Sequence, residues 1–140
     1  MAYATLQDLI TRYGEQRLIE MTDRFDPPAE VIDEGVVAKA LQDASDRIDG
    51  YVRVVYALPL TETPAMLRGL AEDIAFFLLY EEPTDEARKR YTEAVATLRD
   101  ISAGRVKLPI AQGAESPSRP AVVHVTSQPR RFSRQSMGGL

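Results

Sequence analysis

Five carboxylates gather within a short stretch of the chain that also carries two prolines. They are Asp23, Asp26, Glu30, Asp33 and Glu34. Hard cations such as Ca²⁺ bind where several oxygen ligands converge, so this cluster could hold a metal ion. The spacing argues against it, because an EF-hand loop has acids at alternate positions and a glycine at the sixth, whereas Arg24, Phe25 and the prolines interrupt this stretch. We therefore expect a solvated loop that caps a helix, and no metal site.

No other set of residues has the types and spacing of a catalytic or cofactor site. The chain has no cysteine, and its one histidine is His124, so thiolate chemistry is excluded and a metal set has no second imidazole. Gly35, Gly50 and Gly69 are isolated within helical patterns, and Gly138 and Gly139 form a pair near the end, so no phosphate-binding loop is predicted. Carboxylate pairs such as Glu72-Asp73 are sequential, and nothing in the spacing places two of them across a cleft. We predict no catalytic residue, no cofactor and no enzymatic activity.

The residues most typical of a binding function form a basic and partly apolar cluster. It consists of Arg130, Arg131, Phe132, Ser133 and Arg134, followed by Met137 and Leu140. Three arginines around an aromatic ring could contact phosphates and stack on a base. They could also dock on an acidic protein, with Phe132, Met137 and Leu140 as apolar anchors and the arginines at the rim. Docking is favoured because the rest of the chain is acidic and would repel a duplex.

The charge distribution divides the chain into two parts of different composition. Residues 1–104 carry 11 Lys and Arg against 20 Asp and Glu, a net charge of −9, whereas residues 105–140 carry 6 against 1, a net charge of +5. With 140 residues, 44% of them hydrophobic, the chain has room for one modest core. We predict a helical body over residues 1–104 and an extended, basic, partly disordered C-terminal arm over residues 105–140, which reaches for a partner.

Apolar residues recur at helical spacing through the acidic part, which predicts an all-α fold. Thr5 with Asp8 marks the start of a short helix that should stop near Gly14, and a second short helix should follow. Three longer helices should cover about 33–55, 63–80 and 84–102, each bounded by cap residues or prolines. The predicted fold is therefore a small helical bundle of three main helices plus two short N-terminal helices.

The helix predicted over residues 63–80 is apolar nearly all round at its end, where it carries Phe76, Phe77 and Tyr80. Such a helix is normally central in a domain or central in an oligomer. The three aromatic residues could line a ligand pocket. On a helix whose other faces are also apolar, packing in the core is the favoured interpretation.

After Gly104 the hydrophobic pattern changes from helical to alternating. Val106, Leu108 and Ile110 alternate with polar residues or proline, which predicts a short edge strand, and residues 122–125 could form a second one. Neither segment has an obvious partner within the body. We therefore expect these strands to pair with a neighbouring subunit.

Neither a secretory signal nor a membrane-spanning segment is expected. Residues 1–5 include no basic segment followed by an apolar run, and no apolar stretch approaches the roughly 18 residues that span a bilayer. The sequence therefore favours a soluble, intracellular protein with no membrane partner.

Motifs spread over nearly the whole chain resemble those of a known family. They are Tyr3-Ala4-Thr5-Leu6-Gln7-Asp8-Leu9, Arg12-Tyr13-Gly14, Thr22-Asp23-Arg24, Ala44-Ser45-Asp46-Arg47-Ile48-Asp49-Gly50-Tyr51, Tyr56-Ala57-Leu58-Pro59-Leu60, Leu70-Ala71-Glu72-Asp73-Ile74-Ala75, Phe132-Ser133-Arg134 and Met137-Gly138. In these motifs the chain is similar to the small proteins of Mu-like phages and prophages called gene product 36. The spacing from the Ile-Asp-Gly-Tyr segment to the Tyr-Ala-Leu-Pro-Leu segment is the most specific part of the resemblance.

This resemblance implies a virion protein of the phage neck, similar to the helical head-tail connectors that form a ring under the portal. It implies a homo-oligomeric ring, with portal and tail proteins as partners and with DNA passing through the channel without sequence-specific binding. It also implies a location in the virion, and in the host cytoplasm during assembly. The loop at residues 25–28 departs from the Asp- and Gly-rich sequence of relatives, which does not support a cation role there.

Two other classes of function stay open at this point. One is a small nucleic-acid-binding regulatory protein that uses its basic arm, which would fold on DNA or RNA. The other is a small hydrolase or ligand-binding domain, which would need a pocket with convergent polar groups. Nothing in the spacing of the residues indicates such a pocket.

Overall fold

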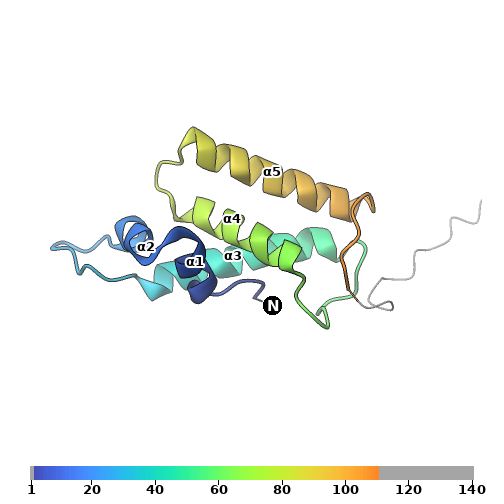
Figure 1. Cartoon of the computed structure of the whole chain (residues 1–140), viewed down its shortest axis with the longest axis horizontal. Helices are drawn as coiled ribbons and strands as arrows, with labels where there is room; N and C mark the ends of the chain where they lie inside the picture. The colour runs from blue at the N-terminus through green and yellow to red at the C-terminus, as the bar shows by residue number, and fades with distance from the viewer. Residues whose placement is uncertain (1, 111–140) are drawn as a thin grey trace, which may run out of the picture.

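The structure is a computed structural model that describes residues 2–110, and these residues form five α-helices (Figure 1). The helices are α1 (Leu6–Tyr13), α2 (Glu15–Thr22), α3 (Glu34–Val52), α4 (Ala65–Leu79) and α5 (Asp85–Ser102). α4 packs against both α3 and α5, and α1 contacts α2, α3 and α4. Two short helices thus precede three long ones, and the described part of the chain has no strand, so the predicted all-α bundle is confirmed.

At three of the helices, a side-chain oxygen at the N-cap accepts hydrogen bonds from backbone N–H groups of the first turn, which have no partner within the helix. Thr5 and Asp8 form a capping box at α1, in which each side chain accepts from the backbone N–H of the other. Asp33 caps α3 and Thr84 caps α5. Gly14 joins α1 to α2 with a φ of 90°, which glycine adopts without steric strain. The start signals predicted at these three helices, and the stop near Gly14, are confirmed.

Two helix ends differ from the prediction. α3 ends at Val52, before the predicted end near residue 55, because the chain turns through residues 53–55 and then buries the ring of Tyr56. α4 begins one residue later than predicted, with Pro64 at its N-cap and no side-chain hydrogen bond from Thr63. Terminal turns of helices commonly shift by a residue or two, and neither difference changes the arrangement of the bundle.

α4 supplies the centre of the core. Its Leu67, Ile74 and Leu79 side chains are almost completely buried. The facing stripes of α3 and α5 are Val37, Ala40, Ala44, Ile48 and Val52, and Ala94, Leu98 and Ile101. Burying a large aliphatic side chain contributes about 1.5–3 kcal/mol, so the contacts of α4 are the main apolar support of this bundle. α4 therefore takes the central position within the domain that its composition predicts.

The segment after α5 turns back onto the body. Arg105 pairs with Asp100 at 2.6 Å, and the N–H of Leu108 donates to the hydroxyl of Tyr56 at 2.9 Å. The Leu108 side chain is only 6% exposed and belongs to the core. The prediction of an edge strand here, paired with a neighbouring subunit, is wrong, because the alternating apolar residues cover the helices of their own chain. The second predicted strand, at residues 122–125, lies outside the described residues.

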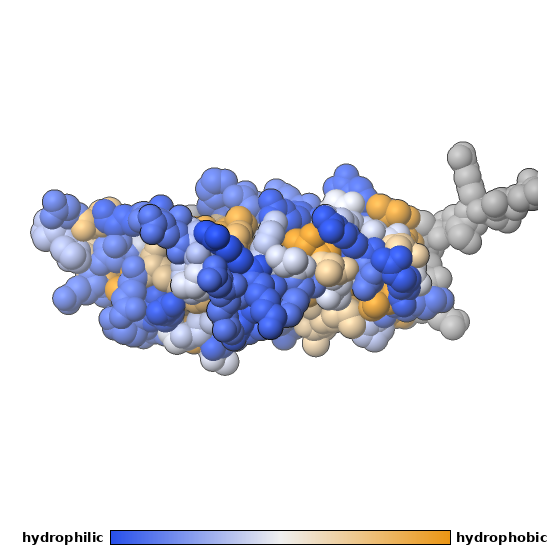
Figure 2. All heavy atoms as spheres, turned by 90° about the horizontal axis from the view of Figure 1, so that it is seen from above, coloured by the Kyte–Doolittle hydropathy of each residue, from blue (hydrophilic) through white to orange (hydrophobic). Residues whose placement is uncertain are grey.

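The outer surface over α5 is largely hydrophilic. Figure 2 shows this face from above, with hydrophobic atoms confined to small separate patches. The α5 residues Arg88, Lys89 and Glu93 are exposed, while Leu98 and Ile101 turn inward. Within residues 2–110, no helix combines the length and the apolar character needed to cross a bilayer.

Candidate interaction site

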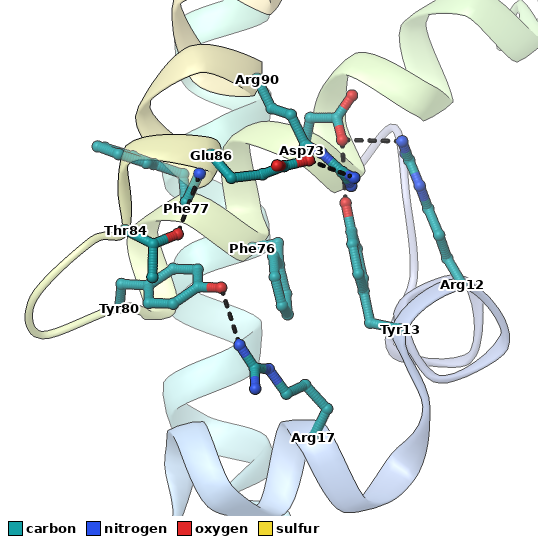
Figure 3. Close-up of a pocket in the computed structure, with 11 residues that line it drawn as sticks. Arg12, Tyr13, Arg17, Asp73, Phe76, Phe77, Tyr80, Thr84, Glu86 and Arg90 are labelled. Atoms are coloured by element: carbon teal, nitrogen blue, oxygen red, sulfur yellow. Dashed lines mark hydrogen bonds and ion pairs between the residues drawn. The ribbon is translucent and has the colours of Figure 1, made fainter.

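A surface hollow of about 410 Å³ opens where α4 ends and α5 begins, beside α1 and α2 (Figure 3). We call it the aromatic hollow and define it by six of its lining residues, Tyr13, Arg17, Phe76, Phe77, Tyr80 and Arg90. Helical spacing places Phe76 and Phe77 on adjoining faces of the last turn of α4, and Tyr80 follows as the C-cap of this helix. The corner at Gly14 brings both short helices beside these rings. Segments far apart in the sequence therefore build one site.

Stacked aromatic rings form the walls of this hollow. Phe76 stacks on Tyr13 with ring centroids 3.8 Å apart and an interplanar angle of 4°, and Tyr80 meets Phe76 edge-on at 5.4 Å. Phe77 stacks on Tyr91 at 4.2 Å. Such pairs add about 0.5–1.5 kcal/mol beyond the burial of their area, so the walls are rigid surfaces. Phe76, Phe77 and Tyr80 are half-buried and line the hollow, and of these three only Phe76 also packs against the hydrophobic core. The favoured interpretation as core residues therefore holds for Phe76 alone.

Charged groups occupy one side of the hollow. Arg12 pairs with Asp73 at 2.8 Å, and the hydroxyl of Tyr13 donates to Asp73 at 3.0 Å (Figure 3). Arg12 also pairs with Glu72 at 2.9 Å. Burial raises the pKa of the Tyr13 hydroxyl, and the Asp73 carboxylate raises it further, so the phenol stays protonated at neutral pH. This network fixes Tyr13 beneath Phe76.

Two further arginines border the hollow. Arg17 donates to the hydroxyl of Tyr80 at 3.2 Å, a neutral partner, and Arg90 pairs with Glu86 at 3.0 Å one helical turn away (Figure 3). The Oγ of Thr84 accepts from the N–H of Ala87, so it is used as the cap of α5. The arrangement suits an apolar or aromatic group that carries a negative charge beside it, because rings can pack on it while Arg17 attracts the charge.

The acidic loop between α2 and α3 organises itself around Asp23. The carboxylate of Asp23 accepts from the backbone N–H groups of Phe25, Ala29 and Glu30, at 3.4, 3.3 and 2.7 Å. Its neighbour Asp33 caps α3, as the sequence predicts. Within residues 2–110, no three potential metal ligands come together. In this stretch, the carboxylates of Asp23 and Asp33 therefore hold the backbone of the loop and of the helix start.

The predicted binding residues are not part of the range that the structure describes. Arg130, Arg131, Phe132, Ser133, Arg134, Met137 and Leu140 fall outside the described residues, as does His124. Sequence reasoning considered a pocket at Phe76, Phe77 and Tyr80 but favoured packing in the core, whereas all three line the aromatic hollow. The available signal was the coincidence of Phe76, Phe77 and Tyr80 with nearby arginines in the short helices.

Comparisons with known proteins place this small helical chain among the proteins of Mu-like phages. The sequence model of the family described as "Bacteriophage Mu, Gp36" matches residues 3–127, and the chain belongs to this family. It is 35% identical to "Gene product J" of Escherichia phage Mu over 140 residues, which covers 99% of both chains. It is also 35% identical to "Mu-like prophage FluMu protein gp36" of Haemophilus influenzae over 115 residues, or 81% of this chain and 80% of that protein. The resemblance stated from the motifs is thus confirmed, and this is a phage protein.

Proposed function

We propose that this chain is a structural protein of the virion, a head-tail connector that assembles as a ring at the junction of portal and tail. The observation that carries the proposal is the similarity to gene product J of phage Mu over 99% of both chains. The similarity thus extends over both the helical part and the C-terminal part of the chain. In the connector that we propose, the helical body forms the ring and the C-terminal part reaches a neighbour.

The charge pattern supports different roles for the acidic body and the basic C-terminal part. Residues 1–104 have a net charge of −9, and DNA sticks to proteins mainly through cations that contact its phosphates. An acidic body around a channel would let DNA pass without sequence-specific binding. The basic residues Arg130, Arg131 and Arg134 would hold the next acidic body or the portal, with Phe132, Met137 and Leu140 as apolar anchors.

The side-chain contacts of the body fit a structural role. Its carboxylates are used in caps and ion pairs, such as Asp33 at α3, Asp100 with Arg105 and Glu72 with Arg12. The proposal therefore includes no catalytic chemistry and no cofactor. The chain would occupy the host cytoplasm during assembly and the virion afterwards, with portal and tail proteins as partners.

Deletion of the gene from the phage or prophage that encodes the chain tests this proposal. Electron microscopy of the induced culture should show filled heads and separate tails, and a plasmid copy of the full chain should restore joined particles. A copy truncated before Arg130 should fold but fail to restore them. Infectious, joined virions without the chain would overturn the connector role. A normal particle yield with altered phage transcription would support the alternative, a nucleic-acid-binding regulator.

A further inference from the structure

The loop between α2 and α3 projects from one end of the body (Figure 1). It exposes two large apolar side chains, Phe25 at 56% and Val31 at 55%. Between them lie Asp26, Pro27, Pro28, Ala29 and Glu30, so the exposed end of the loop combines apolar residues with two carboxylates. A side chain of this size on a projecting loop has the character of an anchor for a partner.

The loop is held in one shape before any partner arrives. Asp23 accepts from three of its backbone N–H groups, and Glu30 takes a positive φ of 55° while its N–H makes the shortest of these bonds. Arg24 ties the base of the loop to Glu81, just after α4, at 3.2 Å. An anchor on a preorganised loop loses little conformational entropy on binding, which raises its affinity.

The aromatic hollow matches this loop in size and chemistry. A closed apolar cavity of about 150 Å³ is large enough for a benzene ring, and this open hollow measures about 410 Å³. Phe25 does not line the hollow of its own chain. Asp26 and Glu30, beside the exposed end, would bring negative charge to Arg17, whose hydrogen bond in the hollow is to the neutral Tyr80.

We propose that Phe25 of one copy of this chain inserts into the aromatic hollow of a second copy, with Asp26 and Glu30 next to Arg17. The inference rests on the proposed function in one respect, because it names a second contact between subunits of the ring, besides that of the basic arm. The loop and the hollow are different surfaces, so the contact is heterologous and can repeat from copy to copy until a ring closes. The basic arm suits this side of the hollow less well, because its arginines would face Arg17.

Cysteine cross-linking tests this contact cleanly, since the chain has no cysteine of its own. One chain carries Ala29→Cys in the loop, and the other carries Glu86→Cys, an exposed position that lines the hollow. Both substitutions leave Phe25 and Arg17 in place. The two full-length chains are expressed together in cells that produce phage, and particles and free protein are treated with a short bis-maleimide. We expect a cross-link between Ala29→Cys and Glu86→Cys chains in the assembled particles.

Matched variants separate the contact from mere proximity. Val54→Cys, at a position 64% exposed, replaces Glu86→Cys as the control and should give no enrichment. Adding Phe25→Ser to the loop chain should lower the cross-linked fraction about 30-fold at limiting concentration, the effect of losing a hot-spot anchor of ~2 kcal/mol. Arg17→Glu should lower it, and Asp26→Arg in the other chain should restore it.

Two results would overturn the contact. One is a cross-linked yield no higher than that of the Val54→Cys control, and the other is a yield unaffected by Phe25→Ser. If joined virions still depend on the chain in that case, the connector role stands and only the contact is wrong. If joined virions form without the chain, the proposed function itself fails.

Discussion

Truncating Leu108 should destabilise the helical body although this residue lies beyond the last helix. The Leu108 side chain is 6% exposed, and its backbone N–H donates to the buried hydroxyl of Tyr56. A buried Leu→Ala change costs about 2–5 kcal/mol, and the lower half of that range applies because a segment near the end of the body can partly collapse. We therefore expect Leu108→Ala to lower the free energy of unfolding by about 2–3 kcal/mol.

Urea denaturation followed by circular dichroism measures this change. With a slope of about 1.5 kcal/mol per molar urea, a loss of about 2–3 kcal/mol moves the midpoint down by about 1.3–2 M. Val54→Ala is the matched control, because Val54 is 64% exposed and its truncation should cost less than about 0.5 kcal/mol. If Leu108→Ala shifts the midpoint no more than Val54→Ala does, the segment at residues 105–110 is not part of the core.

Three further predictions concern a cap, two buried phenols and the centre of the core. Thr5→Ala should lower the free energy of unfolding by about 1 kcal/mol at pH 7, and this difference should shrink in acid. The hydrogen bonds from Thr5 hold the pKa of Asp8 below its ordinary value. Their contribution to stability is therefore present at pH values above the ordinary pKa and is lost as the pH falls through the lowered pKa. If Thr5→Ala costs as much at pH 2 as at pH 7, this reasoning is contradicted. Burial raises the pKa of Tyr3 and Tyr13, so absorbance of the folded chain at about pH 11 should show fewer than six tyrosinates, and the folded state should lose stability at still higher pH. Unfolding in urea at the same pH should ionise the remaining tyrosines. Ionisation of all six tyrosines in the folded chain at about pH 11 would refute this prediction. Ile74→Ala should cost about 2–5 kcal/mol in thermal unfolding, because Ile74 is completely buried on α4, and a cost below 1 kcal/mol would contradict its central position.

The helices were predictable because their signals are local. The capping box at Thr5, the cap at Thr84 and the turn at Gly14 act within a few residues, and the apolar period of each long helix repeats over several turns. The position of α4 also followed from its composition, since a helix apolar nearly all round needs cover on several sides. Local propensity and pattern agreed at these elements, so the bundle could be anticipated.

The aromatic hollow could not be predicted, because its walls join residues that are distant in the sequence. Tyr13 and Phe76 stack although 62 residues lie between them, and no spacing rule connects α1 with α4. The strand predicted around Leu108 was wrong for a related reason. Alternation of apolar residues is equally consistent with a strand and with an extended segment that packs on helices. The hydrogen bond from the N–H of Leu108 to the hydroxyl of Tyr56 shows that the segment packs on its own helices. Only the folded structure brings these two residues together.

The most direct test of the connector role is a cryo-electron-microscopy reconstruction of the neck of virions that carry this chain. A rotationally symmetric ring into which the five-helix body fits, between the portal and the tail, is the predicted result. A neck whose density is fully occupied by other proteins, in virions that are joined and infectious, would contradict it.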